Sequence, residues 1–243
     1  MTYAVILAGG IGKRLQVGTK PKQYFKINKK PLLQYAVEKF LIPRYINYIL
    51  IVANKENIND VKRIIKALIA KHPEYENKIN YCLGGINRNH SISNAIIHLN
   101  NKYEIQDNDI VITHDGVRIF VDSSIIINNI KACKKYPSVS TIIDCVDTPA
   151  EVNENQIKKL LKRDVIKLQQ TPQTFRGIIA KKVYIKDAEY FANDQTTDAC
   201  GLFMQHKIKT HTVAGSTRNF KITTLADLEY AKYLLSKALK NDQ

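Results

Sequence analysis

The stretch Ala4-Val5-Ile6-Leu7-Ala8-Gly9-Gly10-Ile11-Gly12-Lys13-Arg14 decides the fold, and Lys20-Pro21-Lys22-Gln23 follows it closely. Its apolar run is too short for a helix and stops at glycines, which predicts a buried strand that ends in a loop. Glycines let backbone N–H groups approach a ligand, and the neighbouring cations suit a phosphate chain. We interpret the loop as an anion cradle; a plain glycine-rich turn with solvated charges is the alternative.

Two well-known phosphate loops do not match this stretch. A P-loop needs Ser or Thr after Gly-Lys, whereas Arg14 follows Gly12-Lys13 here. A dinucleotide loop needs a third glycine, where this chain has Leu15, and an acidic residue about 20 positions further on. The first acidic residue, Glu38, instead lies in a predicted helix. A triphosphate is therefore favoured over a nicotinamide cofactor.

Outward from this loop, strand-like and helix-like segments alternate. Apolar or β-branched runs typical of buried strands occupy residues 48–53, 79–83, 110–113 and 139–143. Apolar residues recur at helical spacing in residues 32–40, 58–70, 91–99 and 125–134. The alternation predicts an α/β fold with a Rossmann-like, mostly parallel sheet and helices on both faces, in one domain over residues 1–243.

Ligands of such sheets bind outside the carboxyl ends of the strands. Gly9-Gly10, Gly84-Gly85 and His114-Asp115-Gly116 each follow a predicted strand. We therefore expect these three segments to line one crevice.

The alternation stops at Asp144, where polar, then basic, then extended sequence follows. An excursion of this length is usually functional or forms an interface, so we interpret residues 144–170 as an arm that reaches a second subunit. Strands are expected again at 208–213 and 219–222. Thr224-Leu225-Ala226-Asp227 resembles a capping box for the last helix, with Asp in place of Glu or Gln.

Composition limits the functional classes. The net charge of +15 raises nucleic-acid binding as an alternative, but the lysines are scattered and no nucleic-acid motif occurs, so no specific nucleic-acid partner is expected. No signal peptide or apolar run of membrane-spanning length is found, and Cys82, Cys133, Cys145 and Cys200 form no C-x-x-C pair. We expect a reduced cytoplasmic protein without a membrane partner.

Together the motifs resemble the cytidylyltransferase family that makes CDP-methylerythritol or CDP-ribitol from CTP and a polyol phosphate. The matching segments span nearly the whole chain: 7–14, 21–23, 84–91, 114–118, 170–173, 197–199 and 219–223. The resemblance implies a nucleotidyltransferase domain that acts as a homodimer with shared active sites and uses Mg²⁺. The reaction would be in-line attack of the polyol phosphate on the α-phosphorus of CTP, which positioning and cations can catalyse without a covalent nucleophile.

The resemblance also assigns residues. Arg14, Lys22 and Lys221 would hold the triphosphate and the transition state, with solvated surface charges as the alternative. Asp115 would bind Mg²⁺, although an N-capping role also fits, and His114 is interpreted as structural. The anion cradle and a pocket for cytosine and ribose would bind the nucleotide. The residues of these two parts are Ala8, Gly9, Gly10, Gly12, Gly84, Gly85, Arg88 and Ser91. Arg88 would order the loop that follows Gly85, and a helix cap is the alternative role of Ser91. The polyol phosphate would contact Arg118 and Thr171, together with Thr148 and Arg163 from the partner's arm. The alternative is a generic basic arm that has no role in binding the substrate.

Some positions depart from the usual methylerythritol pattern. Ala8-Gly9-Gly10 and Thr197-Asp198-Ala199-Cys200 look more like the ribitol branch, whereas Ile119, in place of proline, matches neither. We therefore expect a cytidylyltransferase that acts on D-ribitol 5-phosphate, for cell-wall or capsule polymers. The alternative is 2-C-methyl-D-erythritol 4-phosphate, for isoprenoid synthesis. A hexose-phosphate nucleotidyltransferase of the same fold is a third hypothesis.

Overall fold

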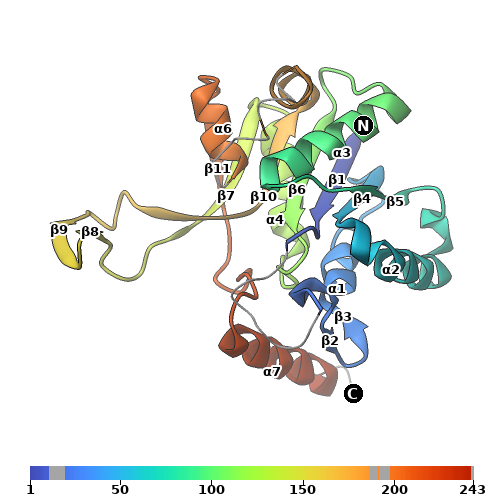
Figure 1. Cartoon of the computed structure of the whole chain (residues 1–243), viewed down its shortest axis with the longest axis horizontal. Coiled ribbons are helices and arrows are strands. Elements are labelled where there is room, and N and C mark those ends of the chain that lie inside the picture. The colour runs from blue at the N-terminus through green and yellow to red at the C-terminus, as the bar shows by residue number, and fades with distance from the viewer. Residues whose placement is uncertain (11–19, 187–190, 192–197, 242–243) are drawn as a thin grey trace.

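The computed structural model describes residues 1–10, 20–186, 191 and 198–241, and it contains a central seven-stranded sheet (Figure 1). The strand order is β11-β7-β10-β6-β1-β4-β5. The strands are β1 (Thr2–Leu7), β4 (Tyr48–Ala53), β5 (Ile79–Leu83), β6 (Ile110–Asp115), β7 (Ser138–Asp144), β10 (Lys167–Arg176) and β11 (Thr210–Ala214). Only β10 runs antiparallel to its neighbours in this sheet, so the expected mostly parallel α/β fold is confirmed.

Helices cover both faces of the sheet. One face carries α1 (Leu32–Glu38), α2 (Ile58–Lys71) and α4 (Ser123–Cys133). The other carries α3 (Arg88–Tyr103), α5 (Gly177–Ile179), the π-helix η4 (Ala180–Ile185) and α6 (Ala199–Gln205). Alternate residues of β1 divide between the faces: Ala4 and Ile6 pack in the first core, Tyr3 and Val5 in the second. Because both faces are buried, the strands appear in the sequence as continuous apolar runs.

A third core joins the C-terminal helix α7 (Leu225–Asn241) to α1. The predicted capping box is confirmed: Asp227 Oδ2 accepts hydrogen bonds from the backbone N of Thr223 and Thr224, and Asp227 N donates to Thr224 Oγ1. Residues 219–222 form no strand, contrary to expectation. Their burial comes instead from packing of the two end residues, since Asn219 and Ile222 are fully buried and Ile222 N donates to the carbonyl of Val117.

Two further boundaries differ from expectation. Helix α3 begins at Arg88 because the Asn87 side chain accepts a hydrogen bond from His90 N at 2.8 Å, so Asn87, and not Ser91, is the N-cap. Strand β6 continues through His114 and Asp115, which were expected to follow it.

The arm is an exposed hairpin of β8 (Ala150–Asn153) and β9 (Gln156–Leu160) that projects away from the body of the protein (Figure 1). Strand β7 leads into the arm and β10 returns from it, entering the sheet between β7 and β6. A second small hairpin pairs β2 (Lys26–Ile27) with β3 (Lys30–Pro31). Within the described ranges, no helix has both the length and the apolar character that crossing a membrane requires.

Candidate active site

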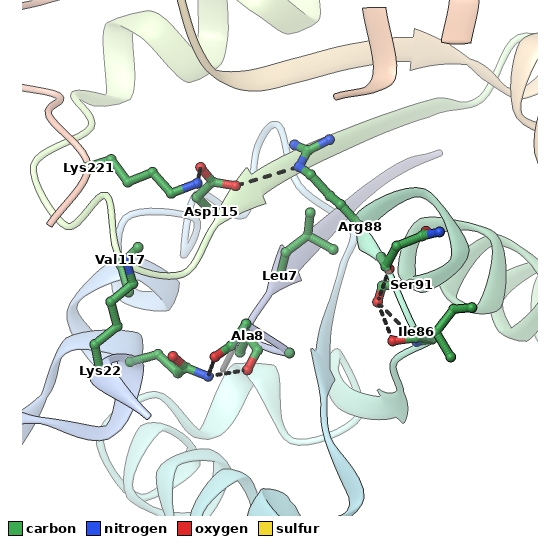
Figure 2. Close-up of a pocket in the computed structure, with 14 residues that line it drawn as sticks. Leu7, Ala8, Lys22, Ile86, Arg88, Ser91, Asp115, Val117 and Lys221 are labelled. Carbon is green, nitrogen blue, oxygen red and sulfur yellow. Dashed lines mark hydrogen bonds and ion pairs between the residues drawn. The ribbon is translucent and has the colours of Figure 1, made fainter. Parts of the chain in front are cut away.

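The predicted crevice is a cavity of about 280 Å³ at the carboxyl ends of β1, β5 and β6 (Figure 2). All three expected segments contribute to its lining, together with side chains from η1 (Lys22–Tyr24), α3 and the loop before α7. The lining residues are Leu7, Ala8, Gly9, Gly10, Lys22, Gln23, Gly85, Ile86, Asn87, Arg88, Ser91, Asp115, Val117 and Lys221. Gly12 and Arg14 lie outside the described residues.

Gln23 fixes the beginning of the anion cradle. Its buried side-chain amide donates to the carbonyls of Ala8 at 2.6 Å and Gly10 at 2.9 Å. This ties η1 to the end of β1, so the neighbouring Lys22 is held at the cavity. Gln23 stood in a matched motif, but the sequence alone gave no sign that its amide closes the loop.

The turn between β5 and α3 forms the opposite wall. Gly85 N donates to Ser91 Oγ at 3.0 Å, and Ser91 Oγ donates to the carbonyl of Asn87 at 2.8 Å. A Cβ atom at Gly85 would lie 2.3 Å from the His90 ring, so the turn has no room for a side chain there. Gly84 is not in the cavity lining, and its N–H donates to Ala53.

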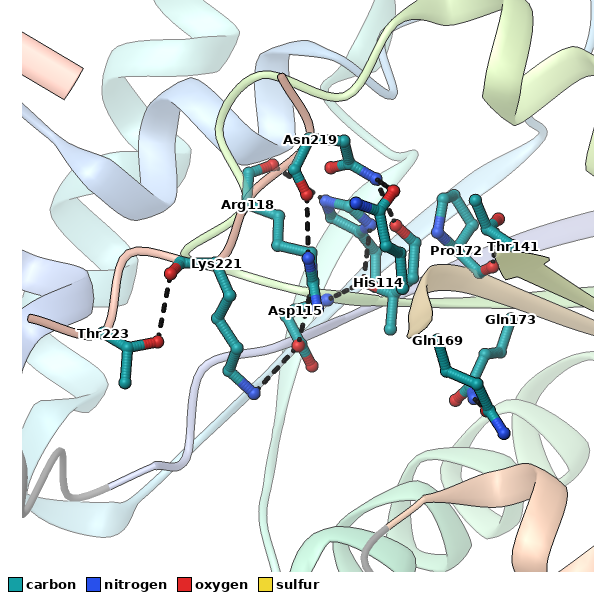
Figure 3. Close-up of polar contacts among 12 residues, drawn as sticks. His114, Asp115, Arg118, Thr141, Gln169, Pro172, Gln173, Asn219, Lys221 and Thr223 are labelled. Carbon is teal, nitrogen blue, oxygen red and sulfur yellow. Dashed lines mark hydrogen bonds and ion pairs between the residues drawn. The ribbon is translucent and has the colours of Figure 1, made fainter. Parts of the chain in front are cut away.

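Asp115 lies between three cations: Lys221 and Arg88 are seen beside it in Figure 2, and Arg118 in Figure 3. Lys221 Nζ is 3.0 Å and Arg118 Nε 3.4 Å from Oδ2, whereas Arg88 Nε is 3.8 Å from Oδ1. Burial by itself would raise the pKa of this carboxyl group, but Lys221, Arg88 and Arg118 outweigh burial and hold the pKa well below its ordinary value. Asp115 is therefore ionised over the whole physiological range.

Thr171 and His114 support Asp115 from behind. The Thr171 hydroxyl accepts from Asp115 N at 3.1 Å and donates to His114 Nδ1 at 3.1 Å, while His114 Nε2 bonds to the carbonyl of Arg118 at 3.0 Å. Burial lowers the pKa of His114 to about 4, so the ring is neutral and acts as a spacer. The structural interpretation of His114 is confirmed.

Asn219 joins the loop before α7 to this support (Figure 3). Its carbonyl accepts from Arg118 Nη1 at 2.8 Å, and its buried amide donates to the carbonyl of Thr171 at 2.8 Å. Ile119 is also fully buried, in the core that contains Ile222 and Leu228. The isoleucine therefore anchors the loop of Arg118 against the segment that carries Lys221.

The side-chain amide of Gln173 holds Arg88 in place. Arg88 Nη2 donates to Gln173 Oε1 at 3.1 Å, and Gln173 Nε2 donates to Gln169 Oε1 and to the buried Sγ of Cys200. Gln173 and Asn219 both stood in matched motifs, yet no role could be assigned to them because their partners come from distant parts of the chain.

Comparisons with known proteins now identify the family. The family model described as IspD: 2-C-methyl-D-erythritol 4-phosphate cytidylyltransferase matches residues 2–237. The chain belongs to this family. A 2-C-methyl-D-erythritol 4-phosphate cytidylyltransferase of Thermosipho africanus is 38% identical over 230 residues, which are 94% of this chain and 95% of the relative. Membership makes the chain a CTP-dependent nucleotidyltransferase.

Solved structures of the family have the same fold. The 4-diphosphocytidyl-2C-methyl-D-erythritol synthase of Anaerococcus prevotii superposes with a TM-score of 0.77 at 26% identity, covering 97% of this chain and 96% of that one. The 2-C-methyl-D-erythritol 4-phosphate cytidylyltransferase of Francisella tularensis gives 0.74 at 28% identity, covering 96% and 98%.

The four positions that the family resemblance assigned to the polyol phosphate fall into two groups. Arg118 and Thr171 lie in the hydrogen-bonded support of Asp115, behind the cavity. Thr148 and Arg163 are exposed on the arm and are not in the lining of this chain's own cavity. Arg163 Nη1 donates only at 3.5 Å, to the carbonyl of Val146. Contact of all four with a substrate stays a prediction.

Proposed function

We propose that this chain transfers CMP from CTP to 2-C-methyl-D-erythritol 4-phosphate and releases pyrophosphate. The observation that carries the proposal is the ionised Asp115 held among Lys221, Arg88 and Arg118, beside a glycine cradle and Lys22. Such a site suits phosphate groups and a metal ion. The choice of polyol rests on the family model and the three relatives described above, which bear the methylerythritol name.

In the proposed reaction, an oxygen of the polyol phosphate attacks the α-phosphorus of CTP. The bond from that phosphorus to the bridging oxygen breaks, and pyrophosphate leaves with the electron pair. A phosphate monoester is already ionised at neutral pH, so no general base is required. Lys22 and Lys221 stabilise the charge that builds up on the phosphoryl oxygens, and Arg14 contributes a third cation from outside the described residues.

The donors present fit Mg²⁺ only in partnership with the nucleotide. No cluster of three or more His, Cys, Asp or Glu side chains occurs in the described part of the chain. Mg²⁺ commonly takes one or two carboxylates and completes its shell with phosphates and water. Asp115 would supply one hard oxygen ligand, and the metal would neutralise phosphate charge.

We further propose that two copies share their active sites through the arms. Large apolar side chains are exposed along the arm, although they contribute to no core of their own chain: Val146, Val152, Ile157, Leu160, Val165 and Leu168. Such a surface favours burial against a second copy. The arm would then bring Thr148 and Arg163 to the partner's cavity.

The absence of disulfides among the cysteines supports the cytoplasm as the site of the reaction.

D-Ribitol 5-phosphate is the second candidate, because Gly10 and Cys200 favoured it in the sequence. The structure gives no support to ribitol phosphate at either residue. A Cβ at Gly10 would meet no atom within 4 Å, so alanine fits there equally well. Cys200 is buried against Gln173. The Gly10 position therefore accepts either residue, and Cys200 is not in the cavity lining.

Pyrophosphate release from CTP and Mg²⁺, measured with the two polyol phosphates side by side, tests the proposal. Release with methylerythritol phosphate alone is expected. Release with ribitol phosphate alone would overturn the choice of polyol and leave the cytidylyl transfer intact. Release with neither, from a folded protein that binds CTP, would overturn both candidate substrates.

A further inference from the structure

A second cavity, of about 510 Å³, lies on the other side of η1 from the active site. It is enclosed by the β2–β3 hairpin, α1 and α2, which adjoin one another in Figure 1. Its lining residues are Lys20, Tyr24, Phe25, Lys26, Lys29, Pro31, Gln34, Asp60, Arg63 and Ile64. None of them is in the lining of the active-site cavity.

The charges around this cavity are unbalanced. Four cations face one carboxylate, that of Asp60, which Lys20 and Arg63 already neutralise at 3.1 Å each. Lys26 and Lys29 form no ion pair with any other described residue. Excess positive charge of this kind, partly enclosed by protein, attracts small anions.

Tyr24 also lines the cavity. Tyr24 is 5% exposed, and its hydroxyl has no hydrogen-bond partner among the described residues. Burial, with a smaller effect from Asp60, raises the pKa of Tyr24, so the hydroxyl keeps its proton. The hydroxyl oxygen has almost no accessible surface of its own, so an anion in the cavity reaches it only after the Tyr24 ring moves. A buried hydroxyl without a partner favours such a movement when an acceptor binds.

The hairpin turn fixes the place of Lys29. Asn28 and Lys29 both have positive φ, at 50° and 66°, which is the geometry of a two-residue turn that usually carries glycine second. The turn therefore places a lysine at the rim of the cavity in a backbone conformation that glycine adopts more easily.

We propose that this cavity is a second anion site, which binds a phosphate or pyrophosphate group through Lys26 and Lys29. The site goes beyond the proposed function, because it lies apart from the lining that would bind CTP and its binding requires no turnover. It shares η1 with the cradle: Tyr24 belongs to the second cavity, whereas Lys22 and Gln23 belong to the first.

Backbone amide chemical shifts of the isotope-labelled full chain, titrated separately with inorganic phosphate and pyrophosphate, test the proposal. Saturable shifts are expected at Lys26, Lys29 and Arg63. Signals of Gly9 and Gly85 report binding at the active site in the same spectra, so the two sites are read independently. Tighter binding of pyrophosphate would indicate the reaction product as the source; equal binding would indicate phosphate groups in general.

The variant Lys29→Gly removes the charge and suits the turn backbone, so the melting temperature is expected not to fall. The double variant Lys26→Gln/Lys29→Gly is expected to bind roughly tenfold more weakly at this site. Lys207→Gly is the matched control, because Lys207 also has positive φ, at 56°, and lies outside the cavity lining. Absence of shifts at residues 26–29 in the wild type, or equal binding by the double variant, would overturn the proposal.

Discussion

Lys221 Nζ lies 3.0 Å from Asp115 Oδ2, so the loop before the last helix reaches the end of the strand at the centre of the active site. The Lys221 side chain is 40% exposed, whereas that of Asp115 is 10% exposed. The lysine is thus a cation that can turn from the carboxylate toward an incoming phosphate.

Lys221→Ala is expected to lower kcat by about 100-fold or more, because a preorganised cation that stabilises developing charge is removed. Steady-state pyrophosphate release measures the effect. Arg218→Ala is the control, since Arg218 is an exposed cation in the same loop. An equal loss in both variants would mean that general charge, and not the position of Lys221, matters.

Lys22→Ala and Arg14→Ala are each expected to abolish turnover while the circular dichroism spectrum and melting temperature stay near those of the wild type. Lys22 lines the cavity at its surface and belongs to no core, so its loss removes charge without removing packing. Lys131→Ala, on α4, is the control for loss of one lysine. Near-normal activity in both Lys22→Ala and Arg14→Ala would contradict the cytidylyl-transfer proposal.

Gln173→Leu is expected to raise the KM for CTP roughly tenfold, because Arg88 loses a charge-assisted hydrogen bond and its orientation at the cavity. Gln169→Leu tests the specificity of the effect, since Gln169 is exposed and accepts a hydrogen bond from Gln173, whereas Arg88 donates to Gln173 itself. If KM changed equally in the two variants, Gln173 would not be a positioning residue for Arg88.

His114 predicts an acid-dependent loss of stability. Its pKa falls from 6.5 to about 4 on folding, so the unfolded chain binds more protons between these values and stability decreases as the pH falls through that window. The full effect is roughly 3 kcal/mol. Urea unfolding at pH 7 and pH 5 should show a smaller difference for His114→Gln than for the wild type. Equal differences would assign the acid sensitivity to other groups.

Shared active sites predict complementation between two inactive variants. In the proposed dimer, Lys22→Ala would damage the active site in its own chain, whereas Arg163→Ala would damage the active site of the partner that its arm reaches. A mixture that is allowed to exchange subunits is expected to recover activity, because a mixed dimer has one site with an intact body and an intact arm. No recovery, despite mixed dimers seen by native mass spectrometry, would contradict sharing.

Ile157→Asp is expected to shift the protein from dimer to monomer in sedimentation velocity, because it places a charge in the apolar surface of the arm. Lys158→Asp, at the next position of the same exposed strand, is the matched control. A wild-type protein that sediments as a monomer at all concentrations would overturn the dimer proposal.

The strands buried on both faces could be predicted from the sequence. Residues 48–53 match β4 because a parallel strand covered by helices is a continuous apolar run. Residues 79–83 match β5, an edge strand that includes Asn80, because Gly84-Gly85 mark its end. The same logic placed Gly9, Gly85 and Asp115 at one cavity. These features are local, or follow from a general rule about sheet edges.

Other features depend on contacts between distant segments. The antiparallel insertion of β10 between β6 and β7 has no local signal, because an extended segment has the same pattern in either direction. Residues 219–222 resemble a strand because Ile222 is apolar, yet Ile222 is buried by Val117 and Leu228 and not by a neighbouring strand. The amide partners of Gln23, Gln173 and Asn219 likewise follow only from the tertiary structure.

The path of β10 separates the arm from the surroundings of Asp115. Strand β10 begins at Lys167, opposite the end of β7, and its register shifts between Gln170 and Gln173, where Thr171 turns toward Asp115. The sheet pairing on both sides of this shift fixes Thr171 and Gln173 in place whatever the length of the hairpin beyond Lys167. Insertions and substitutions in the arm can therefore change its length and its exposed side chains, while the sheet keeps the geometry around Asp115.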